Sequence, residues 1–189
     1  MLIQEKVQQA ASLLQEYDID CWVTFVRESG ILRDPMLDYL IRSDVTWHSA
    51  FIISRTGETR AIVGQMDKQA VEDLGVYTEV LGFVEGIRDH LLSTIQDLNP
   101  RTIAVNFSQT SEVCDGLTHG MYLILQEMLA GIGLADRLVS SEQVCSSLKA
   151  RKTPFELERI KTAIKHTLEI FELVTPFIQP GRTEKEIAA

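Results

Sequence analysis

Several scarcities in this sequence exclude whole classes of protein. Its 189 residues include only 3 cysteines and 5 prolines, too few for a disulfide scaffold or a proline-rich disordered chain. No run approaches the roughly 18 apolar residues that a membrane helix needs, and the first residues form no secretory leader. Basic residues are also few, with 18 Lys and Arg against 27 Asp and Glu. Because the net charge of −9 repels phosphate backbones, we expect no nucleic-acid partner. Since neither a secretory leader nor a membrane helix is seen, we also expect a cytoplasmic protein without a membrane partner.

The cysteines indicate neither a disulfide framework nor a metal site. Cys21, Cys114 and Cys145 are an odd number and lie far apart, so they cannot all pair and none has metal-ligand spacing. We expect reduced, unreactive thiols. The four histidines, at positions 48, 90, 119 and 166, are equally scattered. Phosphate-loop, HExxH and GxSxG motifs are absent, so no complete catalytic site is visible in the sequence.

What the sequence does contain is an alternation of apolar strands and amphipathic helices. Helical spacing is found at 2–17, 35–41, 66–74, 85–98 and 121–129. Strand-like runs occupy 21–26, 49–54, 59–63, 76–83, 102–107 and 138–139. A four-residue connection at 55–58 predicts a hairpin, which makes the sheet mixed rather than purely parallel. The fold class is therefore α/β, a mixed β-sheet flanked by helices.

The C-terminal part differs in pattern. Thr153 and Glu156 form a capping box with Pro154 between them, and an apolar stripe at helical spacing follows from Leu157 to Val174. Thr183 then opens a second capping box, but only one apolar turn follows it. A helix that short cannot hold together alone, so we expect the chain to be the front part of a longer protein. The alternative is a frayed natural C-terminus.

Polar and aromatic residues crowd the 27–48 segment, between the first two buried strands, and ligands of α/β proteins commonly bind at such strand ends. We call this segment the Arg27–His48 lip. It could face a small acidic or zwitterionic ligand or a partner subunit. Equally, it could be a solvated surface of weak ion pairs. No nucleophile is paired with a base here, so a catalytic role is not expected. The candidate substrate- or partner-facing residues are Arg27, Arg33, Asp34, Asp38, Trp47 and His48.

Two C-terminal motifs resemble a known family. The run KTPFELERIKTA at 152–163 is similar to the "K-(S/T)-P-x-E-(I/L)-x-x-(I/M)-x-x-A" junction of the M24 group of metallopeptidases. The run PGRTEKEIA at 180–188 is similar to their "x-P-G-x-(T/S)-E-x-E-(I/V)-A". This group includes Xaa-Pro dipeptidases (prolidases), Xaa-Pro aminopeptidases and creatinase. Residues 1–147 resemble their creatinase-type N-terminal domain, which has a ribonuclease-H-like fold.

The resemblance implies an organisation and a function. Residues 148–189 would be the linker and the start of a pita-bread catalytic domain. That domain holds two divalent metal ions, for example Mn, Co or Zn, on two Asp, one His and two Glu, all beyond position 189. The N-terminal domain would do no chemistry itself. It would shape the substrate cleft, contact its own catalytic domain and support a homodimer. The parent substrate would be a peptide or another small molecule.

The sequence leaves two other functional hypotheses open. The chain could be a free-standing α/β module that binds a small metabolite or another protein, with 151–189 as a partner-binding arm. It could also be a nuclease-like enzyme on the same fold. The nuclease reading requires clustered carboxylates on central strands, and the 21–26 and 102–107 strands carry none.

Overall fold

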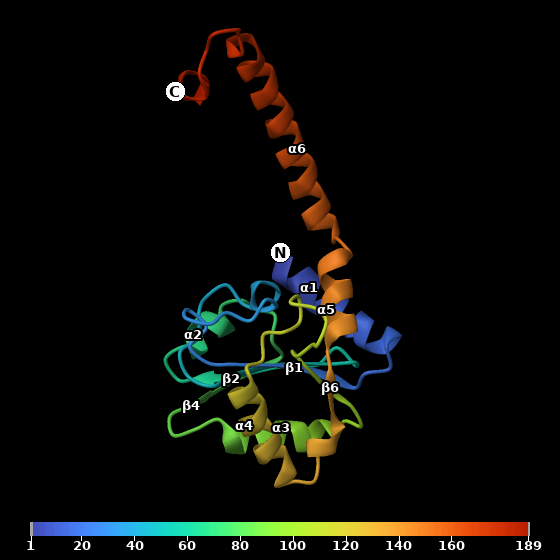
Figure 1. Ribbon diagram of the computed structural model, residues 1–189. Coiled ribbons are helices and arrows are strands. Elements are labelled where there is room, and N and C mark those ends of the chain that lie inside the picture. Colours follow the sequence, from blue (N-terminus) through green and yellow to red (C-terminus); the bar gives the residue numbers. More distant parts are fainter. Residues whose placement is uncertain (1, 189) are drawn as a thin grey trace. The chain divides into compact units, whose positions relative to one another are not determined.

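The computed structural model describes residues 2–188, which separate into two compact units, one ending at Arg151 and one starting at Lys152. Figure 1 shows the elements of both units. The helices of the first unit are α1 (Leu2–Glu16), α2 (Lys68–Glu72), α3 (Arg88–Leu98), α4 (His119–Ala130) and α5 (Glu142–Ala150). Its strands are β1 (Cys21–Val26), β2 (Ser49–Ser54), β3 (Thr59–Gly64), β4 (Glu79–Phe83), β5 (Ile103–Val105) and β6 (Leu138–Ser140). Short 3₁₀ turns lie at Leu37–Tyr39 and Ala135–Arg137.

The six strands form one mixed sheet in the order β4-β3-β2-β1-β5-β6. β2 is antiparallel to both of its neighbours, β1 and β3, and the other pairs are parallel. The predicted hairpin at 55–58 is therefore confirmed. Because only β2 runs the opposite way, the carboxyl ends of β1 and β4 and the start of β2 meet at one edge. Any site built from strand ends belongs at this edge.

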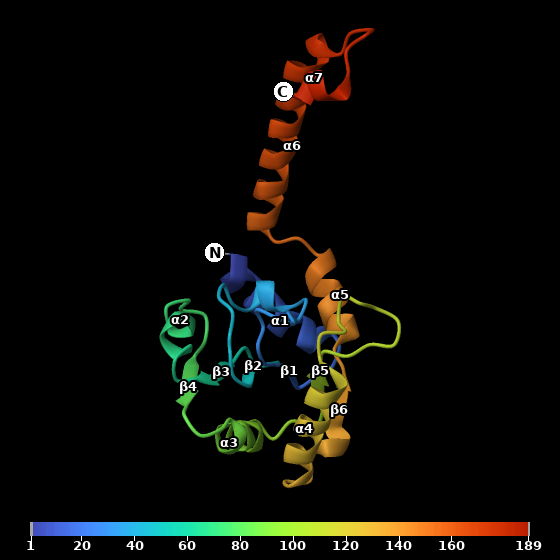
Figure 2. The ribbon, with the colours of Figure 1, turned by 60° about the vertical axis from the view of Figure 1, so that its left-hand side comes forward.

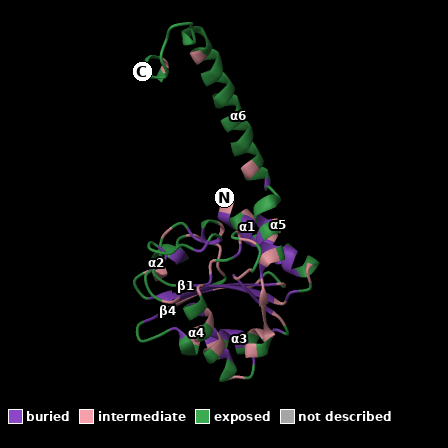
Figure 3. Ribbon diagram, viewed as in Figure 1, coloured by how far each residue is buried: buried purple, intermediate pink, exposed green. Residues whose placement is uncertain are grey.

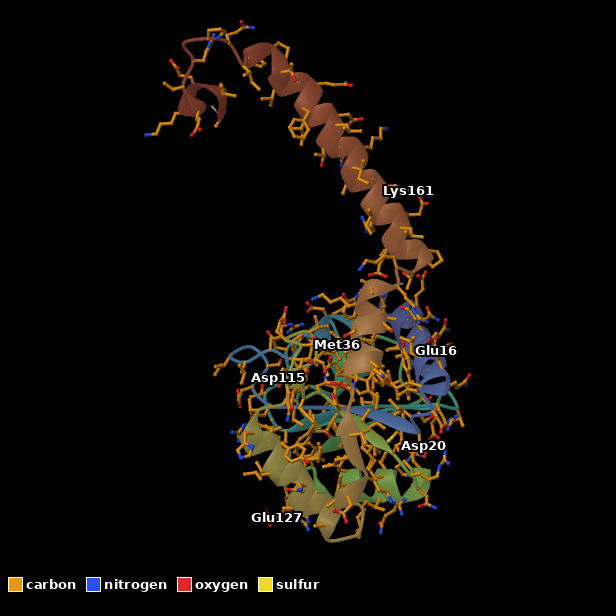
Figure 4. All side chains as sticks on the ribbon, turned by 45° about the vertical axis from the view of Figure 1, so that its right-hand side comes forward. Glu16, Asp20, Met36, Asp115, Glu127 and Lys161 are labelled. Atoms are coloured by element: carbon orange, nitrogen blue, oxygen red, sulfur yellow. The ribbon has the colours of Figure 1, made fainter. Side chains whose placement is uncertain are left out.

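Helices cover both faces of the sheet, as Figures 1 and 2 show from two directions. Side chains alternate along β1, so Trp22 and Val26 pack with α1 and α5, while Val23 and Phe25 pack with α3 and α4. Every residue of β1 is buried, which is why its sequence reads as a continuous apolar run. Figure 4 labels one residue in each of the two helical layers: Met36 lies on the α1 side of the sheet and Glu127 on the α4 side.

The sequence prediction missed one helix and misplaced several boundaries. No helix was expected between 142 and 150, where α5 forms with Val144, Cys145 and Leu148 buried. The expected helix at 35–41 is only a 3₁₀ turn, Leu37–Tyr39, and the expected strand at 102–107 is limited to Ile103–Val105. Since α5 continues to Ala150, the compact unit extends to Arg151, past the boundary at 147 that the sequence suggests.

A buried lysine joins the first helix to the last one of this unit. Lys6 is fully buried, and its Nζ donates to the carbonyl oxygens of Leu148 at 2.6 Å and Arg151 at 3.0 Å. These are carbonyls of the last turn of α5 and the residue after it, which lack helical partners. Arg151 in turn pairs with Glu16 at 2.6 Å. The ends of α1 and α5 are thus tied together by charge-assisted bonds.

The second unit is almost entirely exposed. Helix α6 (Pro154–Val174) begins with the predicted capping box, in which Thr153 accepts from the Glu156 backbone N–H and Glu156 accepts from that of Thr153. None of its residues is buried, as the green ribbon in Figure 3 shows. The short helix α7 (Glu184–Ala188) follows its own capping box at Thr183 and Glu186. Within residues 2–188, no helix combines the length and apolarity needed to cross a membrane.

Candidate functional site

A hollow of about 760 Å³ opens at the edge where β1 and β4 end and β2 begins. We call it the strand-end hollow. Its inner wall consists of core side chains from the α3–α4 side of the sheet, including Phe25, Phe83, Ile87 and Met121. Its mouth is lined by the start and end of the Arg27–His48 lip and by residues 84–86 after β4. The volume lies within the range of small-molecule sites.

Three of the six predicted site residues line this hollow together: Arg27, Trp47 and His48. Arg27 directly follows β1, and Trp47 and His48 directly precede β2, so the antiparallel pairing of these strands brings them to one place. Glu28, next to Arg27, adopts a left-handed backbone with φ of 44°. That conformation costs a non-glycine residue about 1 kcal/mol, and it turns the chain sharply at the mouth of the hollow.

His48 is the most unusual of these residues. Its ring stacks on Phe25 with centroids 5.9 Å apart, and its Nε2 is a buried polar atom with no hydrogen-bond partner among residues 2–188. Burial, together with the nearby charge of Arg27, lowers the pKa of His48, so the ring is neutral at physiological pH. A neutral imidazole with an unused Nε2 can either donate or accept one hydrogen bond.

Trp47 forms one side of the hollow. Its ring lies 5.9 Å from that of Phe83, centroid to centroid. The close packing depends on Gly64 at the end of β3, where a Cβ atom would lie 3.0 Å from Trp47 Cε3. The tryptophan is still 40% exposed, so it offers an aromatic surface to a ligand or partner.

The other three predicted residues lie elsewhere. Arg33 pairs with Asp38 at 2.8 Å and with Asp44 at 2.5 Å, in an exposed cluster on the lip. Pairs of this kind contribute under about 1 kcal/mol each. Arg33 also lines a second hollow of about 560 Å³, beside Phe107, His119 and the Gly116 backbone. The lip therefore divides into a hollow-lining part and an ion-paired surface part.

Asp34 points into the protein rather than toward solvent. It is buried, and its carboxylate accepts from Asn106 Nδ2 at 2.9 Å and from the Met36 backbone N–H at 2.8 Å. Burial raises the pKa of Asp34, although both hydrogen bonds act in the opposite direction. Asn106 Oδ1 also accepts from Trp22 Nε1 at 2.6 Å and Ser141 Oγ at 2.7 Å. Asp34 thus anchors the lip to the sheet.

Sequence reasoning missed the half of the hollow that follows β4. Phe83, Glu85 and Met121 line it, yet no motif marks them. The available signal was the predicted strand at 76–83, but its parallel pairing with β3 could not be read from the sequence. The three cysteines are free and buried. Within residues 2–188, no three His, Cys, Asp or Glu side chains gather as a metal site would require.

Solved structures share this fold, although no protein-family model and no curated protein matches the sequence. An Xaa-Pro dipeptidase from Bacillus anthracis matches 98% of this chain and 46% of its own, with TM-score 0.60 and 19% identity. An X-Pro aminopeptidase from Thermotoga maritima matches 96% and 46%, with TM-score 0.60 and 20% identity. A proline dipeptidase from Streptococcus pneumoniae matches 77% of this chain and 98% of its own, with TM-score 0.56 and 16% identity.

These matches confirm the family resemblance at the level of the fold. The chain has the fold of the N-terminal domains of Xaa-Pro dipeptidases and aminopeptidases, and the predicted mixed α/β class is confirmed as well. The chain spans about half the length of the first two structures, at 46% of each.

Proposed function

We propose that this chain is the non-catalytic N-terminal domain, with the beginning of the catalytic domain, of an Xaa-Pro dipeptidase- or aminopeptidase-like metallohydrolase. The observation that carries the proposal is the extent of the structural match, which covers 98% of this chain and 46% of a solved dipeptidase. Both units therefore have counterparts in one larger protein. The two C-terminal motifs, at 152–163 and 180–188, point to the same family independently of the structure.

In this proposal the chemistry belongs to the domain that would follow residue 189. Two divalent metal ions, for example Mn, Co or Zn, would supply an activated hydroxide there. The α/β unit would shape one side of the substrate cleft and support a homodimer. The exposed apolar side chains of α6, among them Leu157, Ile160 and Ile164, fit a helix that packs against a further domain.

The first test reads the source gene past the codon for Ala189. The proposal expects an open frame encoding two Asp, one His and two Glu at the family's spacing. The purified longer product should hydrolyse Ala-Pro in the presence of Mn²⁺, and it should leave Ala-Ala intact. The 189-residue chain should hydrolyse neither. A stop codon directly after Ala189, or a metal-loaded longer product without Xaa-Pro hydrolysis, would overturn the proposal.

The role of the lip is tested in that longer product. Arg27→Gln, Trp47→Ala and His48→Phe change side chains at the mouth of the hollow. They should raise KM or weaken the dimer while kcat changes little, because no catalytic group is removed. The matched control is Arg88→Gln, an exposed arginine that does not line the hollow. If KM and dimer dissociation stay unchanged in all three lip variants, the lip is only a solvated surface.

The second candidate function is a free-standing module that binds a small molecule. The strand-end hollow favours it, because Arg27 and the His48 Nε2 there have no partner among residues 2–188. The stop codon that would overturn the metallohydrolase proposal would bring this candidate forward. Under both proposals the hollow is the place where a ligand or substrate group would contact this chain.

A further inference from the structure

Charged side chains of both signs line the strand-end hollow without being used in ion pairs within the described part of the chain. Within residues 2–188, Arg27, Glu28 and Glu85 make no ion pair, although all three line the hollow. By contrast, Arg55, Arg60 and Arg101 are each paired with at least two carboxylates. Because these three charged side chains make no ion pair among the described residues, they are available to a ligand.

The signs of these charges restrict the ligand. A simple anion would meet Arg27 favourably but would also approach the carboxylates of Glu28 and Glu85. A simple cation would have the opposite difficulty. A zwitterion satisfies both signs, since its carboxylate can bind Arg27 while its ammonium lies near the glutamates.

The apolar wall of the hollow further restricts the chemistry of the ligand. Phe25, Phe83 and Met121 form an apolar interior, and Ile31 and Val84 stand at the mouth with 86% and 70% of their surface exposed. Aromatic and aliphatic groups on both sides would shield an apolar side chain from water. The hollow, at about 760 Å³, has room for an amino acid or a dipeptide.

We propose that the strand-end hollow binds a zwitterionic α-amino acid or short peptide with a bulky apolar side chain. Arg27 holds its carboxylate, Glu28 and Glu85 attract its ammonium, and Phe25, Phe83 and Met121 receive its side chain. This inference deepens the proposed function, on which it rests, by naming the class of molecule that the substrate-facing hollow takes. It assigns no bond-breaking step to this chain.

The test measures binding to the 189-residue chain itself, without any metal. The probe is L-phenylalanine, titrated by isothermal calorimetry and by ¹⁵N chemical-shift mapping. Saturable binding in the millimolar range is expected, with shifts at His48 and at residues 83–87. Two analogues separate the charges: L-phenylalaninamide lacks the carboxylate and 3-phenylpropionate lacks the ammonium. Each should bind at least about 10-fold more weakly, because each leaves one set of hollow charges unpaired. Glycine, which lacks the apolar side chain, should bind more weakly than either analogue.

Variants locate the site. Arg27→Gln should weaken phenylalanine binding at least about 10-fold, and Glu28→Gln with Glu85→Gln should weaken it while improving the binding of 3-phenylpropionate. All three side chains are exposed, so the variants should fold, which circular dichroism checks. Arg88→Gln is the matched control and should bind as the unchanged protein does.

The inference is overturned if L-phenylalanine does not bind up to about 20 mM, a concentration well above the millimolar affinity expected. It is also overturned if the two analogues bind as tightly as the amino acid, or if Arg27→Gln leaves binding unchanged. Its failure is distinguishable from that of the proposed function. If the longer product has peptidase activity but L-phenylalanine does not bind, only the ligand assignment is refuted. If L-phenylalanine binds but the longer product has no peptidase activity, only the metallohydrolase proposal is refuted.

Discussion

Replacing Lys6 with methionine should substantially destabilise the α/β unit. Methionine keeps most of the apolar stem but removes the ammonium that donates to the Leu148 and Arg151 carbonyls. The bond to Leu148 is buried, so its carbonyl is left without a donor, at a cost of about 1–3 kcal/mol. The Arg151 carbonyl loses less, because Gln9 Nε2 still donates to it at 3.1 Å and water can reach it. Loss of a cation at the end of α5 adds about 0.3–1 kcal/mol.

Relief of the buried charge offsets part of this loss, so the expected net effect is about 1–3 kcal/mol. For a unit of this size, that lowers Tm by about 2–12 °C. The assay is urea unfolding followed by tryptophan fluorescence, because both tryptophans, Trp22 and Trp47, belong to this unit. The control is Lys68→Met, which removes only a surface pair with Glu72 and should cost under about 0.5 kcal/mol. A Lys6→Met effect no larger than that of the control would refute the reasoning.

Three further predictions concern other parts of the chain. Gly116→Ala should lower stability by about 1–3 kcal/mol in urea unfolding, because its Cβ would overlap the Asp34 carboxylate, whereas Gly120→Ala, with open space around it, should not destabilise. The pKa of Asp34 in the folded state lies above its ordinary, unfolded-state value. Its contribution to stability is therefore fully present at a pH below the unfolded-state pKa, and it is lost as the pH rises through the folded-state pKa. From about pH 4 upward, the free energy of unfolding should therefore fall relative to Asp34→Asn, and parallel pH curves for the two proteins would contradict this. Leu168→Glu on exposed α6 should leave the fluorescence-detected free energy of unfolding of the first unit within about 0.5 kcal/mol of the original, and a larger change would contradict this prediction.

The strands were predictable because burial imposes a simple pattern on them. β1 is buried at all six positions, and its run of apolar residues shows this directly. Helix α5 was missed because its buried face needs only three residues, Val144, Cys145 and Leu148, among polar neighbours such as Ser146 and Ser147. Short amphipathic helices of this kind are stabilised by tertiary packing rather than by their own sequence.

The candidate site was predictable only in part. Arg27, Trp47 and His48 could be placed together, because they flank two strands that were visible in the sequence. Asp34 could not be recognised as buried, since its partner Asn106 lies 72 positions further along the chain. Glu85 was not recognisable either, because its position depends on which strand β4 pairs with. Contacts between distant segments thus decide which polar residues of the lip reach the hollow.

The strand order also has a consequence for how this chain reaches its native state. β1 pairs with β2 across a short stretch of chain, but its other neighbour is β5, where Cys21 pairs with Ile103. Strands β1 to β4 can assemble from nearby segments, whereas β5 can join only after the chain closes a long loop. Closing such a loop is entropically costly before any contact compensates for it, and folding rates fall as contacts become more distant in sequence. Until β5 arrives, β1 remains an open apolar edge, and refolding at high protein concentration exposes that edge to other copies.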